Sequence, residues 1–508
     1  MHALLTRLPS PLAKPALLGL LVLAGCCITL SLAPFYYWPL ALLGLFLLHQ
    51  GLEDASGREA LLRSFVFGCG MFVSGCYWVY VSMNTYGGAS PLLAGFMTAV
   101  FCLFLACLLM PFAWFYTRYL SRTHSGRTLG FAALWLLSEW LRTWLLTGFP
   151  WLFIGYSQTE GPLASWAPVI STLGLSLLLA YTAAVLSENA WGKQRHARRL
   201  SLAVVLVIWL SPLLLQQIEW THNRSDRAYK VALLQPNIDL KTKWDPAYIL
   251  PGMLYFQQTT YNLKDQDLII WPETALARRY HQALDYLAEI DQHGKNNNYA
   301  VILGVPSYWY STDGHGFFHN TLVAIGKGDG IYHKQKLVPF GEYVPLEREL
   351  RGLIEFFDLP MSSFREGPAG QPALTAQGLN IMPYICYEVV YPDFVAATAG
   401  SADLLLTVSN DAWFGTSIGP IQHLQMAQMR ALENGRYMLR DTNNGVTAVI
   451  DPQGHIIARL PQFEREVLKA EVYAREGLTP VARYGTLPAV IFSAVAVIAL
   501  LLLHRRMH

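Results

Sequence analysis

Apolar segments of membrane-spanning length fill the first 218 residues of the chain, and they limit the folds that it can adopt. A helix needs about 20 mostly apolar residues to cross the hydrocarbon core of a bilayer. The composition agrees, because 53% of the 508 residues are hydrophobic and 14% are charged. These values exclude an ordinary soluble protein and predict a multi-pass α-helical membrane domain. We place the spans at 15–32, 34–50, 60–82, 91–117, 128–146, 167–187, 200–217 and 486–503.

The first two segments leave alternatives open. Pro34 leaves almost no loop between them, so they form either a tight helical hairpin or a pair in which one helix is short and half-buried. A cleaved signal peptide is the competing interpretation of the N-terminus. Because the apolar run of the first segment continues directly into the second, we favour a segment that stays in the protein.

The basic residues of the membrane region fall in alternate loops, whereas the loops at 83–90 and 147–166 contain no Lys or Arg. Basic loops stay on the cytoplasmic side of a membrane. We therefore expect both termini in the cytoplasm and residues 219–485 on the opposite face, which for a bacterial inner membrane is the periplasm. The basic residues are Arg7, Lys14, Arg58, Arg63, Arg118, Arg122, Arg127, Lys193, Arg195, Arg198, Arg199, Arg505 and Arg506.

From Tyr229 onward, short β-rich runs alternate with longer helical patterns, an order typical of an α/β domain whose sheets are covered by helices. We therefore expect a membrane domain of about seven helices at 1–218, an exported α/β domain at 219–485, and a last span with a short cytoplasmic tail at 486–508. The expected strands are 229–235, 267–271, 300–305, 321–325, 380–386, 404–409, 445–450, 455–460 and 466–471, and the expected helices lie near 246–263, 280–295, 390–399 and 421–436.

Cys386 is the only cysteine of the expected exported domain, since the other six lie in expected spans. There a free thiol behaves as a small apolar residue. In an oxidising compartment an unpaired cysteine is either buried or reactive. A buried core residue at a strand end is therefore the plain alternative for Cys386. The polar motifs upstream of it favour a reactive thiol.

Two charged residues stand upstream of this thiol in separate motifs. Glu273 follows an expected strand, and Lys334 leads into a motif that ends at Glu342. A thiol, a carboxylate and an ammonium group together supply a nucleophile, a proton carrier and a cation for a developing oxyanion. They predict an enzyme that transfers acyl groups through a thioester at a bilayer surface.

In order and spacing these residues resemble the nitrilase superfamily, whose members carry a Glu, a Lys and a Cys on an αββα sandwich. Lys334 stands eight residues before Glu342 in the pattern K-x-x-L-V-P-F-G-E. Together with the membrane segments, the chain is similar to one branch of that superfamily, the apolipoprotein N-acyltransferases of Gram-negative bacteria. The resemblance covers nearly the whole chain through further motifs at 147–151, 155–158, 235–237, 243–244 and 409–415.

This resemblance implies that an acyl chain passes from a phospholipid, typically from the sn-1 position of phosphatidylethanolamine, to the N-terminal diacylglyceryl-cysteine of an apolipoprotein. The reaction would be ping-pong, with no metal or organic cofactor. Glu273 would exchange protons in both half-reactions, and Lys334 and the backbone N–H of Tyr387 would hold the oxyanion. We expect Glu342 and Glu388 to support them, because perturbed charged groups cluster at functional sites.

Aromatic residues are expected near the mouth of this site. For Trp244 and Trp413 the family pattern favours substrate contacts over ordinary core positions. The apolar stretch at 346–361 is either a core helix or a membrane-dipping lid, and we favour the lid. The loop at 148–151 is expected to form a re-entrant or interfacial turn, with Trp151 in the aromatic belt. The expected substrate-binding residues are Gly148, Trp151, Trp244, Asn410, Trp413, Phe356 and Phe357.

Two functions of other classes remain open. A membrane-anchored amidase or nitrilase would use the same three residues with water as the acceptor. A transporter or receptor with an inactive nitrilase-like domain is disfavoured, because most expected spans lack the ionisable residues of a substrate pathway. The net charge of +2 does not favour a nucleic acid partner. We expect a monomer whose partners are the bilayer, a phospholipid donor and diacylated apolipoproteins.

Overall fold

The computed structural model describes residues 10–191, 195–310, 314, 316–339, 341–343 and 364–506. The chain divides into two compact units. The first comprises Met1–Tyr80, Ser90–Glu219 and Tyr484–His508, and the second comprises Val81–Ala89 and Trp220–Arg483. By its contacts, therefore, the short segment 81–89 belongs to the second unit, although it lies between two apolar helices in the sequence. The division expected at 218 and 485 did not include this segment.

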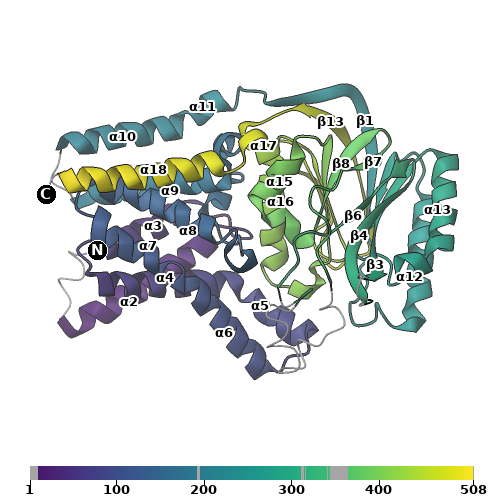
Figure 1. The fold of residues 1–508 in the computed structure, drawn as a ribbon, viewed down its shortest axis with the longest axis horizontal. Helices are drawn as coiled ribbons and strands as arrows, with labels where there is room; N and C mark the ends of the chain where they lie inside the picture. The colour runs from purple at the N-terminus through teal and green to yellow at the C-terminus, as the bar shows by residue number, and fades with distance from the viewer. Residues whose placement is uncertain are drawn as a thin grey trace. The chain divides into compact units, whose positions relative to one another are not determined.

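The first unit is built of apolar helices (Figure 1). Among the described residues, four helices are long and apolar enough to cross a membrane, at Gly57–Cys76, Pro91–Leu120, Ala164–Ala190 and Ala197–Leu215. Shorter apolar helices lie at Lys14–Leu30, Pro39–Leu52 and Leu487–Leu503. The expected multi-pass helical membrane domain is thus confirmed. Its α-helices are α2 (Ser10–Leu30), α3 (Pro39–Leu52), α4 (Gly57–Cys76), α5 (Trp78–Val81), α6 (Pro91–Cys107), α7 (Met110–Phe115), α8 (Phe131–Leu141), α9 (Ala167–Trp191), α10 (Arg195–Leu210), α11 (Pro212–Leu215) and α18 (Leu487–Arg506).

The first two apolar segments form a helical hairpin. Helix α2 ends at Leu30 and α3 begins at Pro39, with turns between them. Gly44 of α3 lies so close to α2 that a Cβ atom there would stand 2.6 Å from the carbonyl oxygen of Ala24. Small residues permit this close approach of two membrane helices. The tight hairpin is therefore the alternative observed, and its second helix starts later than the expected residue 34.

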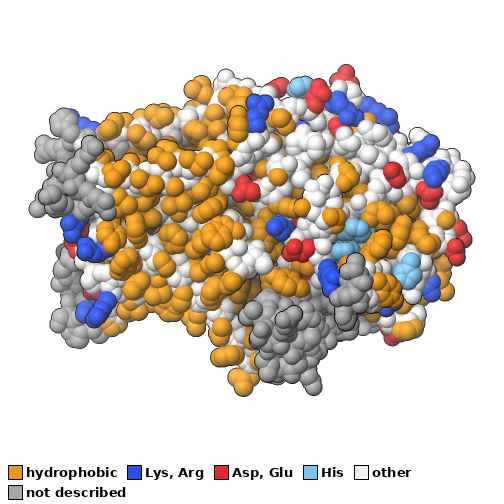
Figure 2. All heavy atoms as spheres, viewed as in Figure 1, with side chains coloured by type: hydrophobic (Ala, Val, Ile, Leu, Met, Phe, Trp, Pro, Cys, Tyr) orange, Lys and Arg blue, Asp and Glu red, His pale blue; other side chains and the backbone are white. Residues whose placement is uncertain are grey.

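Apolar side chains cover the visible face of this helical unit (Figure 2). Such a surface is unfavourable in water by about 25 cal/mol for each Å² exposed, so it indicates contact with lipid. In α18 the exposed large apolar residues are Leu487, Ile491, Phe492, Val495, Ile498, Leu502 and Leu503.

The second unit is an αββα sandwich (Figure 1), which confirms the expected nitrilase-like fold. Its sheets have the strand orders β13-β1-β2-β3-β4-β6 and β12-β11-β10-β9-β8-β7-β5. Helices α12 and α13 cover the six-stranded sheet, and α15 and α16 cover the seven-stranded one. The strands are β1 (Thr221–Gln235), β2 (Leu268–Ile270), β3 (Ala300–Tyr310), β4 (Gly316–Gly326), β5 (Gly328–Asp329), β6 (Ile331–His333), β7 (Leu374–Ala376), β8 (Leu379–Ile385), β9 (Leu404–Ser409), β10 (Met438–Thr442), β11 (Ala448–Ile450), β12 (Ile456–Arg459) and β13 (Glu466–Gly477). The helices are α12 (Pro246–Asn262), α13 (Leu284–Asn297), α15 (Pro392–Ala399), α16 (Gly419–Asn434) and α17 (Pro480–Tyr484).

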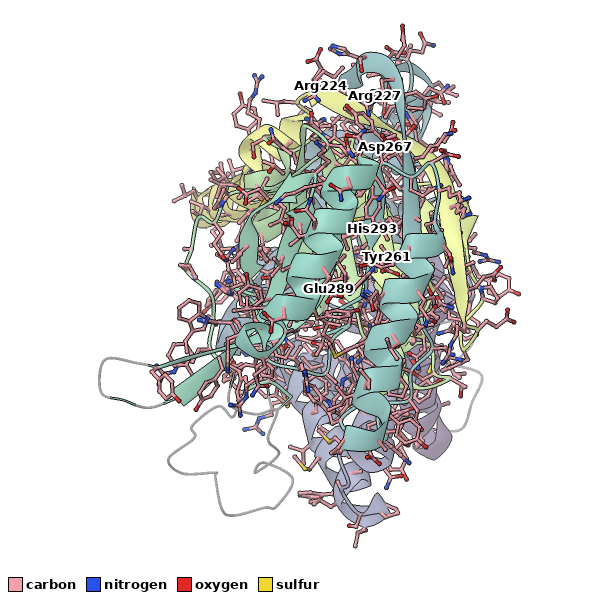
Figure 3. The ribbon with its side chains drawn as sticks, turned by 90° about the vertical axis from the view of Figure 1, so that its right-hand side faces the viewer. Arg224, Arg227, Tyr261, Asp267, Glu289 and His293 are labelled. Atoms are coloured by element: carbon pink, nitrogen blue, oxygen red, sulfur yellow. The ribbon has the colours of Figure 1, made fainter. Side chains whose placement is uncertain are left out.

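The packing of α12 and α13 fixes the position of β2 in the six-stranded sheet. Strands β1, β2 and β3 pair in parallel over part of their length. Parallel strands are buried on both faces, which explains the apolar runs at 231–234, 268–270 and 300–303. Trp271, directly after β2, donates its indole N–H to Thr260 Oγ1 of α12 at 3.1 Å. The two helices lie side by side, and Tyr261 stacks on His293 with ring centroids 3.9 Å apart (Figure 3). The chain that leaves β2 is therefore held firmly.

All nine expected strands of the exported domain overlap an observed strand, but the sequence pattern missed β5, β6, β7 and β10. The first three contain at most three residues each, too few to show a period. Strand β10 was missed because Arg440, Asp441 and Thr442 give it a polar sequence, although all five of its residues are buried. The strand expected at 445–450 begins only at Ala448.

Candidate active site

The ends of three strands position the residues predicted to be catalytic. Glu273 follows β2 and Lys334 follows β6 in the six-stranded sheet, whereas Cys386 follows β8 in the seven-stranded sheet. The charges of Glu273 and Lys334 both act on the Cys386 thiol. The structure thus brings a carboxylate, an ammonium group and a thiol together from two sheets.

Glu273 is a buried carboxylate, with 7% of its surface exposed. Its Oε1 accepts a hydrogen bond from Asn320 Nδ2 at 2.7 Å, and its Oε2 accepts one from the backbone N–H of Asn410 at 2.8 Å. Burial raises the pKa of Glu273, and the attraction of Lys334 only partly opposes that increase. A raised pKa brings a carboxyl group closer to neutral pH, where proton exchange is most effective.

Lys334 is a fully buried cation held by two carboxylates. Its Nζ donates to Glu342 Oε1 at 2.8 Å and lies 3.6 Å from Glu273 Oε1. The other oxygen of Glu342 accepts the backbone N–H of Val338 at 2.8 Å, which fixes that carboxylate in turn. Burial alone would lower the pKa of Lys334, but Glu342 and Glu273 hold it above its ordinary value. Lys334 is therefore charged at neutral pH.

Cys386 lies at a sharp turn from strand β8 into a short helix. Its φ of 54° is in the left-handed region, which costs a non-glycine residue roughly 1–3 kcal/mol. His423 Nε2 donates to the carbonyl oxygen of Cys386 at 3.1 Å and helps to hold the turn. Burial and the charge of Glu273 raise the pKa of the partly exposed thiol more than Lys334 lowers it. The thiol is thus protonated at rest and needs a base.

The carboxylate of Glu388 links a main-chain segment that follows the six-stranded sheet to one at the end of a strand in the seven-stranded sheet. Its Oε1 accepts the backbone N–H groups of Gln335 at 2.6 Å and Lys336 at 3.2 Å, and its Oε2 accepts that of Ile385 at 2.7 Å. Burial raises the pKa of this carboxyl group to about 7, although these hydrogen bonds oppose the shift. The chain next to the lysine is thus tied to the chain next to the thiol. Tyr387, inside the turn, is 8% exposed.

Several polar residues near this group were not predicted as site residues. Asn320 Nδ2 donates to Glu342 Oε1 at 3.3 Å as well as to Glu273, but a single amide inside a β-run carries no sequence signal. Lys243 is 5% exposed, and burial lowers its pKa to about 8 while Glu273 opposes the shift. Ser409 Oγ lies 3.3 Å from Cys386 Sγ. Lys243 and Ser409 belong to the motifs at 243–244 and 409–415. These motifs carry the family resemblance, so they could have identified both residues as site residues.

The expected substrate-binding residues of the second unit lie in different settings. Trp244 is 43% exposed. Asn410 uses its backbone N–H to hold the carboxylate of Glu273, as described above. The carbonyl oxygen of Trp413 accepts a hydrogen bond from Ser82 Oγ at 2.9 Å, and its ring centroid lies 6.1 Å from that of Tyr86. The segment 81–89 therefore supports the loop that holds the carboxylate.

In the first unit, Gly148 and Trp151 lie in a turn within the helical core. Gly148 has φ 89°, and a Cβ atom there would collide with neighbouring backbone, so the turn needs glycine. Trp151 is 1% exposed, and its ring centroid lies 5.0 Å from that of Trp78 and 5.8 Å from that of Phe149. The expectation that Trp151 lies in the aromatic belt is wrong, because other aromatic rings enclose it.

The apolar stretch at 346–361, with Phe356 and Phe357, lies outside the described residues, so the lid stays a prediction. Within the part of the chain that the structure describes, no group of three or more His, Cys, Asp or Glu side chains is arranged to hold a metal ion.

The fold and this group of residues define a membrane protein with a carbon-nitrogen hydrolase domain. The sequence matches the family models "Apolipoprotein N-acyltransferase N-terminal domain" at residues 24–185 and "Carbon-nitrogen hydrolase" at residues 230–479. Relatives named apolipoprotein N-acyltransferase are 49% identical in Azotobacter vinelandii, 48% in Pseudomonas putida and 38% in Vibrio parahaemolyticus. These matches cover 92%, 93% and 98% of this chain and 91%, 94% and 97% of the relatives.

The chain therefore belongs to the apolipoprotein N-acyltransferase family. Its structure is also similar to that of a CN-hydrolase superfamily protein from Xanthomonas campestris, which is 19% identical. That likeness covers 52% of this chain and 97% of the other, with a TM-score of 0.36, and it carries no weight beside the sequence matches.

Proposed function

We propose that the protein acylates lipoproteins at their N-terminus by moving an acyl chain from a phospholipid, through a thioester on Cys386, to the α-amine of a diacylglyceryl-cysteine. The observation that carries the proposal is a buried cluster. Lys334 Nζ lies 3.6 Å from Glu273 Oε1, and the segment that donates the Asn410 N–H to Glu273 also places Ser409 Oγ 3.3 Å from Cys386 Sγ. The named relatives support the class of acceptor. The donor that we expect is phosphatidylethanolamine, with its sn-1 chain transferred.

In the first half-reaction, Glu273 removes the proton of Cys386, and the thiolate attacks the ester carbonyl of the lipid. Lys334 and the backbone N–H of Tyr387 hold the oxyanion. An ammonium group has three N–H donors, and two adjacent carboxylates leave one of them for this role. The loss of one such donor typically costs about 2.7–4 kcal/mol of barrier. Glu273 then gives its proton to the glycerol oxygen, so a lysophospholipid leaves.

In the second half-reaction, the α-amine of the lipoprotein attacks the thioester carbonyl. The pKa of an α-amine is about 8, so the ammonium form first releases one proton to solvent, and the neutral amine attacks. Glu273 takes the second proton from the nitrogen as the tetrahedral intermediate forms. Collapse of that intermediate gives the amide and expels the thiolate of Cys386, which receives this proton from Glu273. One carboxylate therefore serves both half-reactions, and neither step calls for a redox or metal group.

We further propose that the protein lies in the bacterial inner membrane, with both termini in the cytoplasm and the sandwich in the periplasm. The alternate distribution of basic loops supports this orientation. A second support is the segment 81–89, which contains no Lys or Arg and contacts the sandwich through Ser82 and Trp413. Residues in contact lie on the same side of a membrane, so this uncharged loop and the sandwich share one side.

Mass spectrometry of the intact protein, mixed with phosphatidylethanolamine that carries different chains at its two positions, tests the proposal. We expect an added mass equal to the sn-1 chain, which hydroxylamine removes and which Cys386→Ala never acquires. An adduct that persists in this variant would contradict the assignment of the nucleophile.

The same sample distinguishes acyl transfer from hydrolysis. If water were the natural acceptor, free fatty acid would accumulate without any amine. We expect instead that the adduct is stable until a diacylated lipopeptide with a free α-amine is added, and that a triacylated peptide then appears.

A further inference from the structure

Ser409 connects the thiol of Cys386 to a buried ion pair. Ser409 is the last residue of β9, and its Oγ lies 3.3 Å from Cys386 Sγ and 2.6 Å from Asp411 Oδ1. The other carboxylate oxygen of Asp411 accepts a hydrogen bond from Arg440 Nη2 at 2.5 Å. Ser409, Asp411 and Arg440 are all buried. A chain of thiol, hydroxyl, carboxylate and guanidinium therefore runs from the nucleophile into the core.

The single proton of the serine hydroxyl has two candidate acceptors. A hydroxyl donates one hydrogen bond at a time, and an O–H···O⁻ bond of about 2.5–2.7 Å is a strong, charge-assisted one. At rest, therefore, the hydroxyl of Ser409 points to Asp411, and its oxygen accepts the S–H of Cys386. Once the thiol has lost its proton, the sulfur is a negatively charged acceptor. A hydrogen bond from the hydroxyl to this sulfur then becomes favourable.

Asp411 can release the serine because it keeps Arg440 as a partner. Burial opposes its ionisation, but the Arg440 guanidinium holds the pKa of Asp411 below its ordinary value. The pKa of His423 is lowered by burial, and its single ring proton goes from Nε2 to the Cys386 carbonyl, so its Nδ1 accepts from Arg440 Nη2 at 3.2 Å. The carboxylate therefore stays charged and held whichever way the hydroxyl points.

We propose that Ser409 is a further catalytic residue, whose hydroxyl turns from Asp411 to the sulfur of Cys386 and stabilises the thiolate that forms when Glu273 takes the thiol proton. The only proton transferred is the one that leaves Sγ for the carboxylate of Glu273, and the O–H bond of Ser409 stays intact. When the thioester forms, the sulfur loses its negative charge and the hydroxyl returns to Asp411. The inference rests on Cys386 as the nucleophile of the proposed function.

Substitutions at the two ends of this hydroxyl bond have opposite expected effects. Ser409→Ala removes a donor to the thiolate, so the pKa of Cys386 rises. Asp411→Asn replaces the charged acceptor with a weaker, neutral amide and removes a negative charge that raises the pKa of Cys386, so that pKa falls. The other ionisable groups that act on the thiol, Glu273 and Lys334, are unchanged in both variants. If the cluster served only packing, both variants would lower the reactivity of Cys386.

The alkylation rate of Cys386 by iodoacetamide, measured from about pH 6 to about pH 10 on the full protein in detergent, reports the thiolate. Mass spectrometry of the peptide with Cys386 separates it from the six other cysteines. We expect Ser409→Ala to react about tenfold more slowly at neutral pH, since hydrogen bonds to charged groups are strong. Ser409→Thr keeps the hydroxyl and should restore the rate. Ser417→Ala is the matched control, because its Oγ bonds to the Phe414 carbonyl at 2.6 Å.

A pH profile of Ser409→Ala that coincides with that of the wild type would overturn the proposal. If Ser409→Ala shows no cooperative melting transition, the alkylation rate of Asp411→Asn tests the proposal instead. Faster alkylation at neutral pH in Asp411→Asn that falls when Ser409→Ala is added to it supports the turning hydroxyl, and equal rates in the single and the double variant overturn it. Because alkylation requires no lipid, failure here is distinct from failure of acyl transfer, which the intact-mass experiment measures on the wild type.

Discussion

The two sheets of the sandwich contribute unlike halves to the site. On the six-stranded side, Lys334 lies between the half-buried carboxylate of Glu342 and the buried carboxylate of Glu273, with nitrogen–oxygen distances of 2.8 and 3.6 Å. On the seven-stranded side, Cys386 stands at a left-handed turn that is held through its backbone, including the bond from His423 to its carbonyl oxygen. Charges fix one another in the first half, whereas main-chain hydrogen bonds fix the nucleophile in the second.

This difference separates two requirements of acyl transfer. The charged half takes the thiol proton and supplies the cation for the oxyanion, whereas the other half sets the position of the sulfur and, through Ser409 and Asp411, adjusts its pKa. Substitutions in the charged half should therefore change the ionisation of the thiol without moving it. Two carboxylates described above join the halves: Glu273 accepts the N–H of Asn410, and Glu388 accepts N–H groups from the segment after β6 and from Ile385 at the end of β8. Their removal should affect both properties together.

Removal of the nucleophile gives the largest expected effect. Cys386→Ala should abolish both the acyl adduct and lipoprotein acylation, because no other described group takes the place of the sulfur. The charged half does not depend on the thiol for its contacts, so the variant should insert and fold. Acylation assays and thermal melting, run on the same preparation, check both statements. A hydroxylamine-sensitive adduct on the variant would sink the assignment.

Glu273→Gln should have opposite effects on the rate of acyl transfer and on the ionisation of the Cys386 thiol. Without its base, acyl transfer should slow by about 10²–10⁴. Alkylation of Cys386 at neutral pH should nevertheless become faster, because the charge of Glu273 raises the pKa of the thiol and glutamine carries none. Single-turnover acylation and iodoacetamide kinetics measure the two effects. If alkylation slows as well, the charged half also positions the sulfur, and the comparison of the halves fails.

Lys334→Met should change the ionisation of the Cys386 thiol in the opposite direction, by raising its pKa. The ammonium group lowers the pKa of Cys386, so without it the alkylation profile should shift to higher pH. Acyl transfer should fall by about 10²–10³, because the oxyanion loses one donor. Glu273→Gln and Lys334→Met should thus both slow acyl transfer, but they should change the alkylation rate of Cys386 in opposite directions. Near-wild-type turnover of Lys334→Met would exclude the oxyanion role.

The sequence predicted the layers of the sandwich well, and the ends of the membrane helices less well. Strand β9 lies at Leu404–Ser409, as expected, because a short apolar run between turn signals has few other interpretations. The second apolar segment, expected from residue 34, begins its helix at Pro39. Apolar composition marks burial in lipid and burial in protein alike, so it cannot locate a helix end. Trp151 was expected at the membrane interface because it lies in a loop between two apolar segments, and it is buried.

Within the site, short motifs at strand ends made Glu273, Lys334 and Cys386 predictable. Asn320, which donates to Glu273, and Arg440, which donates to Asp411, were not, because each stands inside a strand. A polar residue there is ordinarily an outward-facing position. Only the pairing of strands in the folded sheets shows that these side chains turn inward to a carboxylate.

The smallest expected effect, and the one that tests the connection between the halves, is that of Glu388→Gln. An amide cannot accept all of the backbone N–H groups that the carboxylate accepts, and a donor left unpaired costs about 1–3 kcal/mol. Acyl transfer should fall less than in the charge variants, because no group of the reaction is removed. Thermal melting of the wild type and the variant, from about pH 5 to about pH 8, measures the loss.

The pH dependence of that loss has a definite sign. Burial raises the pKa of Glu388 in the folded protein to about 7, above its unfolded value of about 4.3. The folded state therefore binds the proton more tightly, so this contribution is complete below the unfolded pKa and is lost as the pH rises through about 7. Glutamine does not titrate. The difference in melting temperature between wild type and Glu388→Gln should therefore narrow from pH 5 to pH 8, and a constant difference would show that Glu388 is already ionised across the range.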